Sequence, residues 1–344
     1  MKTIAGIVAE FNPFHQGHRY LIEQVKKTLH PDLLVVIVSG PFSSRGLPCM
    51  QTQTVRTQKA LEAGADLVIG LPSVFAMQSA DYFAKYAIQS LKTAGVNLLC
   101  FGSESNDLRA LEEQLEALES MEKDPSLSLA RNAQKNGVAP RPNDILALQY
   151  LKNAKALDIQ VRPFQRNDSF ESATSIRKNY FASSNPESHP DFEPRQNWDS
   201  YYPLLRYALL ETPPARLASF FLVSEGIENR MIKAARTATT WEEFLESAVS
   251  KTYSRARIQR TAMMILMQIE RAEVEAHSSF FEIQVLGFNQ KGQQHLASLP
   301  EDTPIYSRIR QVPEPLRSWL IQSETLYSFF SPDSAGWRVQ RFNT

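Results

Sequence analysis

The feature that most constrains this chain is the alternation of short apolar runs with helical segments over its first hundred residues. The runs cover residues 4–9, 33–38, 67–71 and 96–101, and helices are expected between them at 18–29, 54–63 and 79–93. Runs this short and apolar are typical of strands buried on both faces. The alternation therefore predicts an α/β fold: a doubly wound, Rossmann-like parallel sheet with helices on both sides.

The segment after the first run is typical of a phosphate site. The apolar run stops at Glu10, Asn12 and Pro13 form a turn, and His15-Gln16-Gly17-His18 opens a helix. A helix N-terminus attracts anions, and glycine lets a ligand approach the backbone. Right-handed crossovers bring the carboxyl ends of parallel strands to one edge, so loops 10–18, 39–46 and 102–104 are expected to meet there.

The second half of the chain has a different composition. Residues 183–194 are rich in Ser, Asn and Pro, which is typical of a linker, and helices follow at 202–210, 215–222, 229–237, 241–249 and 255–275. Segments 282–287, 304–309 and 316–330 follow no clear pattern. We predict two domains, 1–182 for nucleotide binding and 195–344, mostly helical with a small mixed C-terminal part.

The balanced charge of the chain limits how it could bind a nucleic acid. The 37 basic and 37 acidic residues cancel, so an RNA partner would need a local basic patch. One candidate patch lies in the helical half of the chain and contains Lys251, Arg255, Arg257 and Arg260. A solvated helix face is the simpler interpretation of this patch.

Metal, disulfide and membrane features are not expected. Cys49 and Cys100 are too few for a disulfide framework, and the histidines outside the motif are scattered, so we predict no metal site. No apolar run approaches the ~18 residues of a membrane span. A reducing cytoplasm is the expected location.

Several motifs together resemble one family. The segment 11–18 is similar to the signature of the HIGH-type nucleotidyltransferase superfamily. The further motifs resemble its tRNA(Met) cytidine acetate ligase family, and they are Ser39-Gly40 with Arg45-Gly46, 64–68, 101–104, 142–146, 172–177, 225–230 and 286–289. The matches extend over most of the chain.

The resemblance implies an ATP-dependent ligase with two steps. Acetate and ATP would form acetyl-adenylate, and the acetyl group would pass to N4 of the wobble cytidine of elongator tRNA(Met), giving N4-acetylcytidine. His15 and His18 would be catalytic, Mg²⁺ would accompany ATP, and neither a membrane nor another protein partner is implied. The implied ATP-binding residues are Ile7, Val8, Ala9, Glu10, Phe11, Asn12, Pro13, Phe14, His15, Gln16, Gly17, His18, Arg19, Tyr20, Gly102, Asn143 and Arg166, to which we add Arg177.

The resemblance and the basic segment together favour RNA contact by Lys251, Arg255, Arg257 and Arg260 over a merely solvated helix face. Two other functions stay open. One is adenylylation of a small phosphorylated acceptor, and the other is an inactive RNA-associated binding protein of the same fold. The second is motivated by departures from the family pattern at Pro41, Phe42, Val55 and Gly70 and by the shortened segment 126–141. Intact His15, Gly17 and His18 argue against loss of the chemistry.

Overall fold

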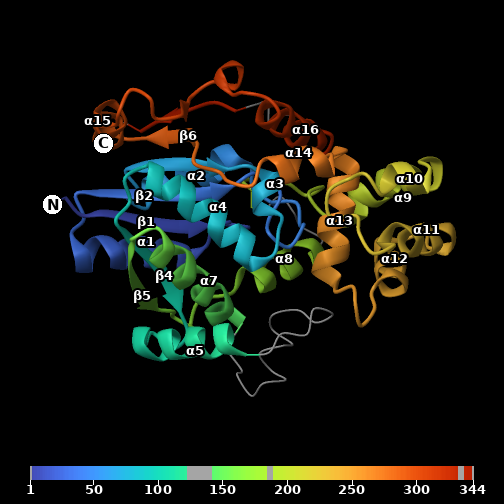
Figure 1. The fold of residues 1–344 in the computed structure, drawn as a ribbon, viewed down its shortest axis with the longest axis horizontal. Helices are drawn as coiled ribbons and strands as arrows, with labels where there is room; N and C mark the ends of the chain where they lie inside the picture. The colour runs from blue at the N-terminus through green and yellow to red at the C-terminus, as the bar shows by residue number, and fades with distance from the viewer. Residues whose placement is uncertain (1, 122–141, 184–188, 332–336, 343–344) are drawn as a thin grey trace.

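The computed structural model describes residues 2–121, 142–183, 189–331 and 337–342 (Figure 1). Segment 126–141 and residues 184–188 of the expected linker lie outside the described residues, as do the side chains of Pro142 and Asn143. Within the described part, no helix has the length and apolar character needed to cross a bilayer.

The first half of the chain alternates strands and helices as its sequence predicts. Its strands are β1 (Ile4–Ala9), β2 (Leu33–Ser39), β3 (Leu67–Leu71), β4 (Leu98–Ser103) and β5 (Gln160–Gln165). Its helices are α1 (Gln16–Leu29), α2 (Gln53–Glu62), α3 (Ser73–Ala76), α4 (Ala80–Thr93), α5 (Leu108–Ser120), α7 (Pro142–Ala156) and α8 (Ala173–Ala182).

These five strands pair in parallel in the order β5-β4-β1-β2-β3, which confirms the doubly wound sheet. Alternate residues of β2 enter two apolar clusters on opposite faces. Val35 and Ile37 pack on the side of α4 and α7, whereas Leu34 and Val36 pack on the side of α1 and α2. The strand order reverses between β1 and β4, because β2 and β3 are added on one side of β1 and β4 and β5 on the other. Ligands of such folds bind at the carboxyl ends of the strands at this point.

The helical region lies beside the sheet (Figure 1). Its helices are α9 (Trp198–Glu211), α10 (Pro214–Leu217), α11 (Ile227–Thr237), α12 (Trp241–Ala248), α13 (Arg255–Met267) and α14 (Arg271–Ala276). The single helix expected at 255–275 was wrong, because Gln268 adopts φ +54° and ends α13. The apolar cluster on the α4 side of the sheet continues into α9 and α13, so both regions share one core.

The C-terminal segment, which had no assigned place, returns to the sheet. Its elements are β6 (Ile283–Phe288), α15 (Gln290–Ser298), β7 (Ile305–Tyr306), the 3-10 helix η2 (Ile309–Gln311), α16 (Leu316–Ser328) and β8 (Gln340–Arg341). Strand β6 pairs antiparallel with β3, and β7 and β8 pair with β6. The division into domains at 182 and 195 stays a prediction.

A buried arginine joins the carboxyl ends of β1 and β2. Arg56 of α2 is fully buried, and its Nη1 donates to the carbonyl oxygens of Glu10 (2.8 Å) and Ser39 (2.9 Å). Its Nη2 donates to the Gly40 carbonyl at 2.8 Å, and its Nε donates to the Gln51 carbonyl at 3.2 Å. One guanidinium therefore fixes the loops that leave both strands.

We expect Arg56→Ala to lower the free energy of unfolding by about 3–5 kcal/mol, because several buried carbonyls lose charge-assisted hydrogen bonds. Urea unfolding measures this loss. The matched control is Arg109→Ala on α5, where the side chain is 88% exposed and forms an ion pair with Glu113. That control should change stability by less than about 0.5 kcal/mol. Equal effects of the two changes would contradict this role of Arg56.

Candidate active site

Hydrogen bonds of the Asn12 side chain and of Arg177 on α8 hold the turn after β1 in place. Asn12 Nδ2 donates to the Pro48 carbonyl (3.1 Å), and its Oδ1 accepts from the Met50 N–H (3.0 Å). Arg177 of α8 donates to the Asn12 carbonyl and, at 3.2 Å, to Thr174 Oγ1. The turn is thereby fixed relative to both loop 39–50 and α8.

The two histidines of the motif cap α1 reciprocally. His15 is the N-cap residue, and its Nδ1 accepts from the Gly17 N–H at 3.0 Å. His18 Nδ1 in turn accepts from the His15 N–H at 3.2 Å. The ring centroids of His15 and His18 lie 3.8 Å apart, and Phe11 and Phe14 pack against His18. This is a capping box in which imidazoles replace the usual hydroxyl and carboxylate.

Burial and neighbouring cations keep both rings neutral. Burial, then Arg166 and Arg177, lower the pKa of His15 from 6.5 to about 4, although Glu171 opposes this shift. Burial, then His15 and Arg166, hold the pKa of His18 well below its usual value. Between pH 6.5 and about 4 the unfolded chain binds a proton at His15 that the folded chain does not, so this histidine lowers stability as the pH falls through that range.

The cap also determines which ring nitrogen carries the proton. Because each Nδ1 accepts a hydrogen bond from a backbone N–H, the proton of each neutral ring resides on Nε2. The start of α1 therefore presents two imidazole N–H donors together with the positive end of a helix dipole. Such donors can bind phosphate oxygens without themselves carrying a full charge.

The end of β4 and the residue after β5 form a neighbouring part of the site. A Cβ built on Gly102 would lie 3.3 Å from Arg166 Cγ, so the exposed Arg166 side chain crosses directly over this glycine. Asp144 of α7 fixes the loop, because its Oδ1 accepts from Ser103 Oγ (2.8 Å) and the Glu104 N–H (3.1 Å). Asn143 lies in the first turn of α7, but its side chain is outside the described part.

The remaining predicted ATP-binding residues differ in how far their side chains are exposed to solvent. The side chains of Ile7, Phe11, Asn12, Pro13 and Phe14 are buried, so these residues shape the turn from within. Half-buried or exposed residues with atoms nearer solvent are Val8, Ala9, Glu10, Gln16, Gly17, Arg19 and Tyr20. The Glu10 carboxylate accepts a hydrogen bond from the Ser44 N–H, which joins loops 10–18 and 39–46 as expected.

A cavity of about 360 Å³ opens beside His15. The residues that line it come from the start of α1, from α2 and from the segment that leads into α8, and they are Phe14, His15, Gln16, Arg19, Lys59, Ser169, Phe170, Glu171 and Ile176. The sequence did not single out Lys59, Phe170 or Glu171. No motif spacing links these residues, since the fold alone brings them together.

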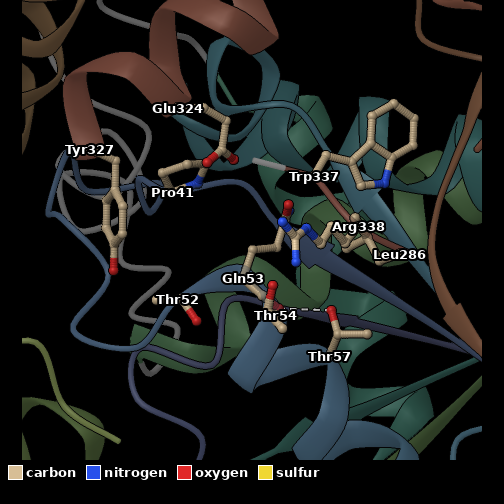
Figure 2. Close-up of a pocket in the computed structure, with 10 residues that line it drawn as sticks. All are labelled: Pro41, Thr52, Gln53, Thr54, Thr57, Leu286, Glu324, Tyr327, Trp337 and Arg338. Carbon is tan, nitrogen blue, oxygen red and sulfur yellow. Dashed lines mark hydrogen bonds between the residues drawn. The ribbon is translucent and has the colours of Figure 1, made fainter. Parts of the chain in front are cut away.

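A second cavity, of about 20 Å³, lies between the start of α2 and the C-terminal segment (Figure 2). Thr54 and Thr57 of α2 line it from one side, and Glu324 of α16 and Arg338 line it from the other. Burial raises the pKa of Glu324 to about 7, although Arg56 opposes the shift. None of the predicted site residues lines this cavity.

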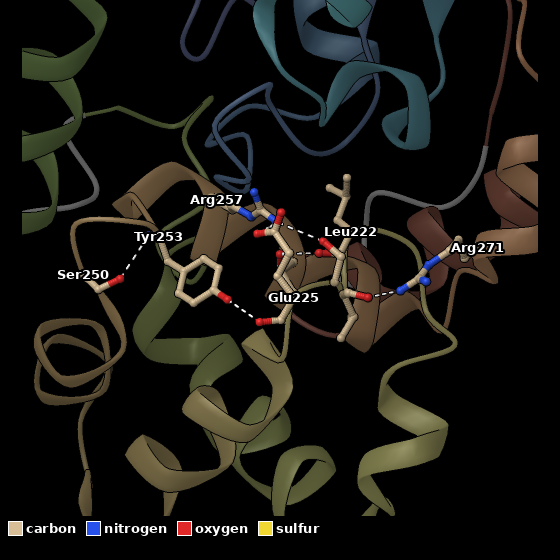
Figure 3. A network of polar contacts seen from close by, with 9 residues as sticks. Leu222, Glu225, Ser250, Tyr253, Arg257 and Arg271 are labelled. Atoms are coloured by element: carbon tan, nitrogen blue, oxygen red, sulfur yellow. Dashed lines mark hydrogen bonds and ion pairs between the residues drawn. The ribbon is translucent and has the colours of Figure 1, made fainter. Parts of the chain in front are cut away.

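The predicted RNA-binding arginines lie at the start of α13, but acidic residues accompany them. Arg255 pairs with Glu242 at 2.5 Å. Arg257 pairs with Glu225 at 3.2 Å (Figure 3). Arg260 donates to the Ser44 carbonyl at 3.4 Å, and burial lowers its pKa to about 10. Lys251 is exposed.

All three of these arginines therefore have structural partners. Figure 3 shows Arg257 and Tyr253 gathered around Glu225, where the chain passes from α10 to α11. Arg260 instead donates to the carbonyl of Ser44, whose N–H binds the Glu10 carboxylate. Arg260 therefore contacts the loop that borders the histidine motif. Position 46 requires a glycine, because its φ is +69° and a Cβ added there would lie 2.6 Å from the backbone nitrogen of Arg260.

Within the described residues, no group of three or more His, Cys, Asp and Glu side chains is placed to hold a metal ion. The buried Arg56 and the half-buried Arg177 both donate to backbone carbonyls of the turn after β1. The arrangement is suited to binding an anionic ligand through N–H donors.

Comparisons with known proteins match this chain to a nucleotidyl transferase family. The HIGH Nucleotidyl Transferase family model matches residues 1–340. The chain is 37% identical over 339 aligned positions to a tRNA(Met) cytidine acetate ligase of Streptococcus agalactiae serotype III, covering 89% of this chain and 88% of the relative. A Streptococcus uberis protein of the same name is 34% identical over 371 positions, covering 99% and 97%.

A solved structure shares the whole fold. The crystal structure of Thermotoga maritima TmcAL bound with alpha-thio ATP superposes with a TM-score of 0.81 at 25% identity, covering 99% of this chain and 100% of that chain. The family model and the relatives together show that the chain belongs to the HIGH nucleotidyl transferase family and, within it, to the tRNA(Met) cytidine acetate ligases.

Proposed function

We propose that this protein uses ATP to activate acetate and transfers the acetyl group to N4 of the wobble cytidine of elongator tRNA(Met). The observation that carries the proposal is the near-complete coverage of relatives named as tRNA(Met) cytidine acetate ligases. The ATP analogue bound to a structural neighbour and the two neutral imidazole donors at the start of α1 support it. A tRNA substrate would place the reaction in the cytoplasm.

In the first step an acetate oxygen attacks the α-phosphorus of ATP, the bond to the bridging oxygen breaks, and pyrophosphate leaves with the electron pair. Little covalent chemistry is required of the protein, since positioning and charge stabilisation dominate such displacements. His15 and His18 are the proposed donors to the phosphate oxygens through Nε2–H, and both lie at a helix N-terminus that favours negative charge.

The other proposed ATP contacts surround the histidines. Gly102 would let the nucleoside lie against the backbone, with Arg166 over it and Asn143 completing the site. The guanidinium of Arg177 already binds the Asn12 carbonyl, so its proposed role is to hold the turn and to supply positive charge behind the phosphates. Mg²⁺ is proposed to arrive with ATP as its phosphate complex, because the described residues provide no acidic cluster for it.

The start of α13 is the proposed tRNA contact, through Lys251, Arg255, Arg257 and Arg260. Arg255 is 55% exposed, and its partner Glu242 is 57% exposed. A phosphate can displace an exposed partner at small cost, because surface ion pairs contribute little. Arg257 and Arg260 contact the segment near Glu225 and the loop near Ser44, so tRNA bound there would lie close to the proposed chemistry.

The direct test incubates the protein with ATP, Mg²⁺ and radiolabelled acetate, with and without elongator tRNA(Met). Acetate-dependent adenylate without RNA and acetylcytidine with RNA are expected. An adenylate that forms only on a phosphorylated small acceptor would instead support the alternative nucleotidyltransferase. The absence of both products would rule out an active ligase.

We expect His18→Gln to lower acetate-dependent ATP–pyrophosphate exchange by about 10²–10³-fold, as loss of a preorganised donor does elsewhere. Glutamine at this position can still accept from the His15 N–H, as in an ordinary capping box, so the fold should survive. The matched control is His30→Asn, at the exposed left-handed residue that ends α1. Exchange within twofold of wild type in His18→Gln, which corresponds to about 0.4 kcal/mol, would remove His18 from the chemistry.

Two substitutions with opposite expected effects on tRNA affinity test the proposed tRNA contact. Arg255→Gln should weaken tRNA binding and reduce the salt slope by about one, because one phosphate contact is lost. Glu242→Gln should strengthen binding, because it removes the acid that pairs with Arg255. Filter binding over a salt series measures both. Unchanged binding in both variants would show that Arg255 lies outside the tRNA interface.

A further inference from the structure

The cavity beside His15 has features that the proposed adenylation step does not use. Phe14, His15, Gln16 and Arg19 of the expected ATP-binding set line one part of it, whereas Lys59, Ser169, Phe170, Glu171 and Ile176 line the rest and Gly102 and Arg166 do not line it. His15 therefore lies where the proposed nucleotide site adjoins a space of about 360 Å³. An acceptor that attacks an adenylate must approach from such an adjoining space.

The walls of this cavity combine aromatic and cationic side chains. Phe14 and Phe170 line it, and Phe170 packs against Tyr20 with ring centroids 5.7 Å apart. Arg19 lies 5.9 Å over the Phe14 ring, and Lys59 pairs with Asp191 at 2.6 Å. Proteins that bind unpaired RNA bases stack them on aromatic rings and hold the flanking phosphates with cations.

Glu171 offers a preoriented acceptor at the same place. Its Oε1 accepts from Ser175 Oγ (2.7 Å) and from Asn179 Nδ2 (2.8 Å), both on α8. Within the part of the chain that the structure describes, no hydrogen bond engages Oε2. The carboxylate raises the pKa of His15 against the shift that burial causes, so it lies within electrostatic reach of the proposed reaction centre.

We propose that this cavity binds the acceptor cytosine, with Glu171 Oε2 accepting a hydrogen bond from the N4 amine. This inference rests on the proposed function and names the residue that recognises its second substrate. Carboxylates of Glu and Asp are the side chains that accept from cytosine N4, and uracil presents an oxygen acceptor there instead. Arg19 and Lys59 hold the phosphates beside the inserted base.

The same contact serves the transfer step. The N4 lone pair attacks the carbonyl carbon of acetyl-adenylate and forms the N–C bond. The bond from that carbon to the phosphate oxygen breaks, and AMP leaves with the electron pair. The proton that N4 loses passes to Glu171 Oε2, so the carboxylate acts both in recognition and as the general base.

Glu171→Gln tests the proposal with little change of shape. The amide oxygen can keep the bonds from Ser175 and Asn179, which turns the NH₂ group toward the cavity in place of Oε2. A donor then faces the N4 donor. The matched control is Glu23→Gln, at an exposed glutamate of α1 that does not line the cavity.

Three readouts are needed. Acetate-dependent ATP–pyrophosphate exchange should stay at the wild-type level, while acetyl transfer to tRNA should fall by about 10²-fold, as loss of a general base does. Binding of an anticodon stem-loop with C at the wobble position should weaken by about tenfold, and the stem-loop with U there should bind as well as or better than the C form. Glu23→Gln should match wild type throughout.

Two results would overturn the inference. Loss of exchange in proportion to transfer would assign the cavity to ATP, and an unchanged preference for C over U would remove Glu171 from base recognition. The stem-loop measurement requires no catalysis, so it separates this inference from the proposed function. A wild-type protein without acetate-dependent exchange would contradict the ligase, whereas the C-over-U comparison would still decide the role of Glu171.

Discussion

The reciprocal cap between His15 and His18 is the interaction on which the rest of the site depends. Each imidazole gives its Nδ1 to a backbone N–H at the start of α1, and this one arrangement begins the helix and fixes both rings. Burial then favours the neutral form of both. The consequence is a pair of oriented Nε2–H donors at a positive helix end, which is the chemistry that the proposed adenylation needs.

Arginine bonds to carbonyl oxygens hold the surrounding loops in register with that cap. Arg56 joins the ends of β1 and β2, and Arg177 reaches from α8 to the Asn12 carbonyl. Loop 39–46 then connects the site to the helical region, since Trp198 Nε1 donates to the Gly46 carbonyl at 3.0 Å. The proposed tRNA contact at the start of α13 and the proposed adenylation site therefore both pack against this loop.

Periodicity and turn chemistry predicted the parallel sheet and the meeting of loops 10–18 and 39–46 at one edge, because both follow from local pattern and crossover handedness. Other features depend on contacts distant in sequence. The return of β6 to pair with β3, the roles of Arg56 and Asp144, and the cavity that contains Glu171 have no local signal. The acidic partners of Arg255 and Arg257 also come from other segments, so a count of basic residues overstated their free charge.

The measurement that tests the cap most directly is ¹⁵N NMR of the His15 and His18 rings over a pH titration. The account predicts that both rings are neutral, with Nδ1 unprotonated and Nε2 protonated, and that His15 gains a proton only near pH 4. It further predicts that ATP shifts the Nε2 signals. A ring that titrates near pH 6.5, or that carries its proton on Nδ1, would contradict the account.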